Sequence, residues 1–152
     1  MAKLNEITTG MNQSAKAIDE NFKKLNDNSL SVLSKGFWYM NAETTIKPSK
    51  TLSDCKTGWI LQWQPTNDGK TKINSNFYYL HVPKAMIMDE GGGGSASVTA
   101  PLFSGVGQIL ESITKMVYIS NTGVTGHSNN SLSTDLDGKG TRHWVMTAIY
   151  EY

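Results

Sequence analysis

The spacing of apolar residues changes once along the 152-residue chain, and this change limits the folds that it can adopt. Before about residue 34, apolar residues recur every three or four positions, which is the period of one face of an α-helix. From Gly36 onward they recur at every second position, as in a β-strand with one buried face. The sequence therefore predicts a helical segment over residues 1–34 and a β-domain over residues 35–152.

The N-terminal segment carries one narrow apolar stripe. Its members are Leu4, Ile7, Met11, Ala15, Ile18, Phe22 and Leu25. Gly10 is a poor helix former, so we expect the regular helix to begin near Met11 and to fray over Asn26–Ser29. A narrow stripe at the end of a chain favours a homo-oligomeric bundle, and packing of the helix on its own domain is the alternative. A bundle this short is marginally stable, so contacts in the β-domain must support it.

Six later segments have the composition of short strands separated by turns. They are Phe37–Met40, Gly58–Gln64, Asn76–Val82, Ser97–Phe103, Ile113–Ser120 and Arg142–Tyr152. The stretch Thr122–Gly140 is rich in Gly, Asn, Ser and Asp and is expected to form loops. Strands of this number and length predict a mainly β fold, an antiparallel sandwich or barrel that follows the N-terminal helix.

The last predicted strand is apolar on both faces. Trp144, Met146 and Ala148 alternate with Val145 and Ile149 along it. A strand with two apolar faces is covered on both sides. We therefore expect one face to lie in the domain core and the other near an axis between subunits.

Composition limits the classes of function. The chain has 14 Lys and Arg residues against 13 Asp and Glu, a net charge of +1, and so lacks the basic excess typical of a nucleic-acid-binding protein. A single cysteine, Cys55, excludes an intrachain disulfide and a cysteine-rich zinc site. No apolar run suits a signal peptide or reaches the ~20 residues that span a bilayer. We expect synthesis in a cytoplasm and no membrane partner.

The residues that carry catalytic or metal chemistry elsewhere are dispersed or lie in turn sequences here. His81, His127 and His143 lack metal-binding spacing, and Asp135 and Asp137 belong to a turn-like segment. Asp89 and Glu90 are adjacent and lead into the four glycines 91–94, which lack the phosphate-loop pattern. Cys55 has no histidine near it in the sequence. We predict a protein that is not an enzyme and that holds no cofactor or metal.

Trp38 and Tyr39 are the candidate saccharide-binding residues. Trp and Tyr rings stack on sugar rings when they are exposed, although most aromatic residues in a small β-domain belong to its core. Because the two residues are adjacent in a predicted strand, they point to opposite faces. At least one of them is therefore expected to lie outside the core.

Two segments resemble a known family. Residues 11–26, MNQSAKAIDENFKKLN, resemble the leading helix of trimeric tail-fibre and baseplate proteins of tailed bacteriophages. Residues 113–152 are similar to the head domains of those proteins, with a strand, a turn, a Thr125-Gly126-His127 corner, a polar loop and a closing strand, Trp144–Tyr150. The resemblance implies a virion protein of a siphophage that infects Gram-positive bacteria, similar to the receptor-binding proteins of lactococcal phages. Their heads trimerise and, in some members, bind cell-wall saccharide.

The chain is shorter than full receptor-binding proteins, which carry a shoulder and a neck. The resemblance therefore implies a small tail or baseplate protein, located in the virion and made in the host cytoplasm. Its expected partners are two further copies of itself, other tail or baseplate proteins, and cell-wall polysaccharide if it takes part in host attachment. The alternative is a lectin-like module that binds cell-wall polysaccharide through an aromatic groove.

Overall fold

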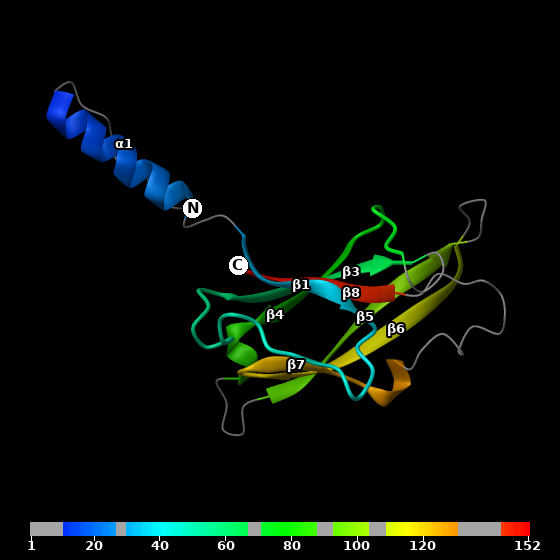
Figure 1. The fold of residues 1–152 in the computed structure, drawn as a ribbon. Helices are drawn as coiled ribbons and strands as arrows, with labels where there is room; N and C mark the ends of the chain where they lie inside the picture. Colours follow the sequence, from blue (N-terminus) through cyan, green and yellow to red (C-terminus); the bar gives the residue numbers. More distant parts are fainter. Residues whose placement is uncertain (1–10, 27–29, 67–70, 88–92, 104–108, 131–143) are drawn as a thin grey trace.

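The computed structural model describes residues 11–26, 30–66, 71–87, 93–103, 109–130 and 144–152, and all statements below concern these residues. They form one helix followed by two antiparallel sheets of four strands each (Figure 1). The predicted mainly β chain with an N-terminal helix is therefore confirmed.

The helix α1 spans Met11–Asn26, within the limits expected from the sequence. Asp19 and Lys23, one turn apart, form an ion pair of 2.8 Å on its exposed surface. Figure 1 shows α1 lying apart from both sheets. No helix in the described parts of the chain is long and apolar enough to cross a membrane.

The first sheet, called sheet I, contains strands in the order β1-β8-β3-β4. Their bounds are Ser31–Trp38 for β1, Trp144–Glu151 for β8, Gly58–Pro65 for β3 and Tyr78–Pro83 for β4. The strands β3, β4 and β8 lie close to the predicted segments. β1 begins at Ser31, inside the 1–34 segment predicted to be helical, because residues 31–38 pair with β8 rather than continuing α1.

The second sheet, called sheet II, contains strands in the order β2-β7-β6-β5. Their bounds are Thr45–Ile46 for β2, Gly123–Gly126 for β7, Ile109–Ser120 for β6 and Gly93–Phe103 for β5. Two short 3-10 helices, η1 at Lys84–Ile87 and η2 at Ser128–Asn130, complete the elements. The loop prediction for 122–140 is wrong at β7, which pairs with both β6 and β2.

One hydrophobic core receives side chains from both sheets. Trp59, Leu61 and Trp63 are fully buried in it, on the face of β3 that the alternating pattern predicts. Val117 and Ile119 of β6 join them from sheet II. The remaining buried members are Met40, Leu52, Cys55, Val82, Val124, Trp144, Met146 and Ile149. Burial of so many large side chains is the main stabilising contribution to a domain of this size.

The first six residues of β8 are all buried, so the predicted coverage of both faces is confirmed. β8 lies between β1 and β3 in sheet I. Val145 and Ala148 are buried within the single chain, although neither belongs to the shared core. The second face of β8 is therefore covered without contact with another subunit. The sequence pattern had instead predicted that this face lies near an axis between subunits.

Candidate interaction surfaces

The apolar stripe of α1 is open to solvent. Ile18 is 40% exposed and Phe22, one turn later, is 67% exposed. Ala15 is also exposed, and Met11 and Leu25 lie near the two ends of the helix. Leu4 and Ile7, the other predicted members of the stripe, lie outside the described residues. An amphipathic helix packed on its own domain would bury Ile18 and Phe22, and neither is buried.

Trp38 and Tyr39 lie on different sides of their chain segment. Trp38 is partly buried and packs against the core. Its indole covers Gly36 so closely that a Cβ atom there would lie 2.2 Å from Cζ2 of Trp38. Tyr39 instead contacts Phe37 edge to face, with ring centroids 5.5 Å apart. The two candidate saccharide-binding residues therefore do not form one surface.

A second pair of aromatic residues lies on the outer face of sheet I, the face turned away from the core. Phe77 is 41% exposed and Tyr79 is 51% exposed, and their rings are nearly parallel, at 18°, with centroids 6.4 Å apart. Tyr79 is paired with Gln62 of β3. Paired residues in an antiparallel sheet share a face, and Gln62 alternates with the core residues Leu61 and Trp63. The alternation along β3 is visible in the sequence, but the strand pairing that brings Tyr79 to this face is not.

Hydrogen bonds fix the side chain of Gln62 at this face. Its Oε1 accepts from Oγ1 of Thr147 at 3.0 Å and from the hydroxyl of Tyr150 at 3.4 Å. Its Nε2 donates to the hydroxyl oxygen of Tyr79 at 3.2 Å. All three partners are hydroxyl groups, and in this arrangement Oε1 accepts twice and Nε2 donates once. The amide joins β8, β3 and β4, and it anchors the outer end of the Tyr79 side chain.

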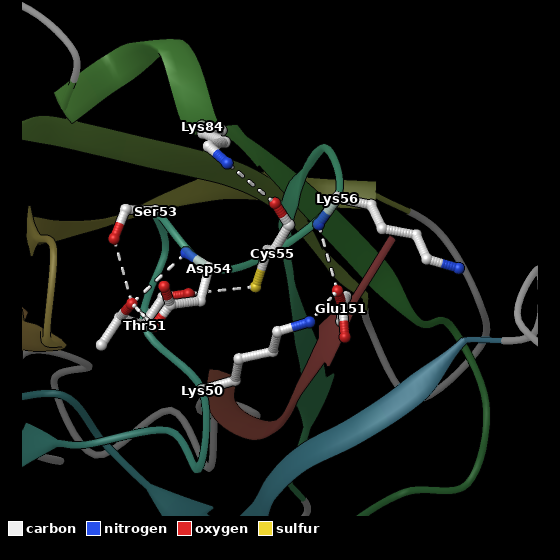
Figure 2. Close-up of polar contacts among 8 residues, drawn as sticks. All are labelled: Lys50, Thr51, Ser53, Asp54, Cys55, Lys56, Lys84 and Glu151. Carbon is white, nitrogen blue, oxygen red and sulfur yellow. Dashed lines mark hydrogen bonds and ion pairs between the residues drawn. The ribbon is translucent and has the colours of Figure 1, made fainter.

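A polar cluster pins the segment before β3 to the end of β8 (Figure 2). Nζ of Lys50 lies 2.7 Å from Oε1 of Glu151, which also accepts from the backbone N–H of Lys56 at 3.1 Å. The Cys55 thiol donates to the backbone carbonyl of Thr51 at 3.2 Å. Figure 2 shows these side chains gathered where the segment turns back toward the sheet.

Two pKa values in this cluster are shifted, in opposite directions. The Lys50 ammonium, through its hydrogen bond to Glu151, holds the pKa of that carboxyl below its usual range. Burial raises the pKa of the Cys55 thiol, which therefore stays protonated. A buried, protonated thiol is a poor nucleophile and a poor metal ligand.

The two histidines that the structure describes, His81 and His127, have different ring contacts. His81 contacts Tyr152 edge to face, whereas His127 contacts the ring of Tyr118 on sheet II. His143, Asp135, Asp137, Asp89 and Glu90 lie outside the described residues. Among the residues that the structure describes, no three His, Cys, Asp or Glu side chains gather in a way that could hold a metal ion. Comparisons with protein-family models, curated proteins and solved structures gave no match.

Proposed function

We propose that this chain is a non-enzymatic structural protein of a bacteriophage tail or baseplate and that it works as a homotrimer. The observation that carries the proposal is the exposed apolar stripe of α1, at Ile18 and Phe22, on a helix that lies apart from the sheets. The class of protein comes from the resemblance of residues 11–26 and 113–152 to phage tail proteins. On this proposal the two sheets form a β-sandwich head, and α1 joins the heads of three chains.

The exposed stripe has a physical reason to associate. Burying a side chain such as Phe22 contributes about 1.5–3 kcal/mol per chain, whereas leaving it in water contributes nothing. Residues Ile18 and Phe22 are four positions apart and therefore lie on one side of α1. Three such helices placed side by side would bury both residues in a common seam. The helix is only 16 residues long, so we propose that contacts between heads add to the stability of the trimer.

Association of three chains through α1 would also strengthen attachment to a host surface. Three heads held at one point face the same surface together, so weak contacts of each head add as avidity. This gives a structural protein a part in host attachment without any catalytic group.

The assembly can be tested by light scattering of the purified chain. We expect a mass about three times the 16.7 kDa of one chain. Phe22→Asp would place a charge in the seam and should give monomers, while Lys16→Asp, at an exposed position beside the stripe, should keep the trimer. Near-ultraviolet circular dichroism of both variants checks that the buried tryptophans keep their packing. A monomeric parent chain, or a Phe22→Asp variant of unchanged mass, would contradict the role of α1.

The virion location needs a separate measurement. Mass spectrometry of purified phage particles should detect peptides of this chain at a fixed ratio to other tail proteins. Their absence from intact particles, with the chain present in the infected cell, would contradict a tail or baseplate role.

A second function, a lectin-like module for cell-wall polysaccharide, is favoured by a different observation. Trp38 packs against the core, but Phe77 and Tyr79 are exposed side by side on sheet I. Binding of the isolated protein to host cell walls would support this function. Release of reducing sugar from the same walls would instead indicate a glycan hydrolase.

A further inference from the structure

We infer that the outer face of sheet I is a binding site for a neutral saccharide, built around Tyr79 and Gln62. This inference extends the lectin-like function to a defined site, and it does not depend on the proposed trimer, because all the residues involved belong to one chain. The site differs from the Trp38–Tyr39 pair that the sequence suggested.

Tyr79 presents an open ring that is held in place. Half of the residue is exposed, yet its hydroxyl is anchored by Nε2 of Gln62 at 3.2 Å. Phe77 lies beside it with a nearly parallel ring. Aromatic rings bind the C–H face of a sugar by stacking, and a ring that is already fixed loses little rotational freedom when it does so.

The same residues have hydrogen-bonding capacity left for a ligand. Nε2 of Gln62 carries two N–H groups and uses one for Tyr79. Tyr79 accepts that bond, and its own hydroxyl proton has no acceptor among the described residues. Two directed donors therefore stand at the edge of an exposed ring. Sugar hydroxyls, which are placed around an apolar ring face, fit this combination of stacking and hydrogen bonding.

The charge of the face favours a neutral ligand. Glu151 is the only acidic residue in the four strands of sheet I, and its carboxylate is already paired with Lys50. By strand pairing and alternation, the described strand residues of the outer face include one lysine and one histidine, Lys35 opposite Ala148 and His81 opposite Ile60. No carboxylate among the described strand residues of this face would attract a metal ion or a basic peptide. The polar centre around Gln62 also argues against an apolar protein partner.

The inference can be tested by saturation-transfer-difference NMR on the whole chain. The probes are four soluble oligosaccharides: a trimer of N-acetylglucosamine, maltotriose, a galactose disaccharide and a rhamnose disaccharide. We expect at least one to receive magnetisation on its ring C–H protons. Tyr79→Ala should weaken that binding at least tenfold, and Tyr79→Phe, which keeps the ring, should weaken it less. Tyr118→Ala is the matched control, because Tyr118 is 50% exposed but lies on sheet II.

Three results would overturn the inference. They are no transfer to any of the four probes, equal loss in Tyr79→Ala and Tyr118→Ala, and a lower assembly mass of Tyr79→Ala in light scattering. The last result would make this face a contact between subunits. A monomeric parent chain that still loses saccharide binding on Tyr79→Ala would refute the proposed trimer and support the site. The two proposals can therefore fail separately.

Discussion

The side-chain nitrogen Nδ2 of Asn130 lies 2.7 Å from the backbone carbonyl oxygen of Met40, 90 positions earlier in the chain. The same side chain accepts from the N–H of Met116 at 2.8 Å and donates to the Met116 carbonyl. Asn130 is only 1% exposed. Met40 adopts a left-handed backbone conformation, with φ of 59°, which is uncommon for a residue other than glycine. One buried amide therefore joins the chain after β1 to strand β6.

Replacement of Asn130 by alanine should destabilise the fold strongly. The carbonyl of Met40 would keep the N–H of His127 at 3.0 Å, but Met116 would lose Asn130 as the partner of both its N–H and its carbonyl. Leaving buried backbone groups unpaired costs about 1–3 kcal/mol for each group, so we expect a loss of at least 2 kcal/mol. Urea unfolding measures it, and Asn74→Ala, at an exposed position, is the control. Equal midpoints for the two variants would contradict the role of this amide.

Gly126 of β7 also lies close to the backbone of Met40. A Cβ atom at Gly126 would lie 1.9 Å from the carbonyl oxygen of Met40, which is backbone and cannot rotate away. Gly126→Ala should therefore separate β7 from the segment after β1 and cost about 3 kcal/mol.

Thermal unfolding of Gly126→Ala beside Gly94→Ala tests this steric argument. The added Cβ at Gly94 would contact the side chain of Met86, whose terminal Cε is nearest at 2.7 Å, and this flexible side chain can move. The Gly94 variant should therefore unfold close to the parent chain and the Gly126 variant well below it. Similar unfolding temperatures for both variants would show that the close approach at Gly126 is tolerated.

The parts of the fold that the sequence predicted are those with long periodic patterns. Helix α1 and strands β3 and β8 are eight or more residues long, and their apolar spacing identifies them without knowledge of the fold. The strands β2 and β7 have two and four residues, which is too short for a period to be visible. They are strands because they pair with each other and because β7 pairs with β6, and such pairing is a tertiary property.

The candidate saccharide site also depends on strand pairing, which the sequence pattern does not reveal. The alternation of β3 assigns Gln62 to the outer face, but the register of β4 against β3 decides which residue lies opposite it. A shift of β4 by one residue would place Tyr78 or Leu80 beside Gln62 instead of Tyr79. The adjacent Trp38 and Tyr39 were conspicuous in the sequence, although bulges in the β1–β8 pairing and contacts with the core decide where they point.

The buried thiol of Cys55 should not react in the folded protein. Cys55 is buried, donates to the Thr51 carbonyl, and has a pKa raised by burial, so little thiolate is present at neutral pH. We expect an aromatic disulfide reagent to label the native chain very slowly and to label one thiol per chain at once in guanidinium. The absorbance of the released thiolate measures both rates. Fast labelling without denaturant would show that the 50–56 segment opens readily.

The ion pair between Lys50 and Glu151 should make stability depend on pH in acid. Folding lowers the pKa of Glu151 through its hydrogen bond with Lys50, so the pair stabilises the fold fully above the pKa of an unfolded glutamate, about 4.3. This contribution is lost as the pH falls through the lower pKa of the folded state. Glu151→Gln should therefore unfold at a lower temperature than the parent chain at pH 7, and the difference should shrink by pH 3. Glu43→Gln, at an exposed loop position, is the matched control, and a difference that stays constant with pH would mean that Glu151 stabilises the fold by contacts other than its charge.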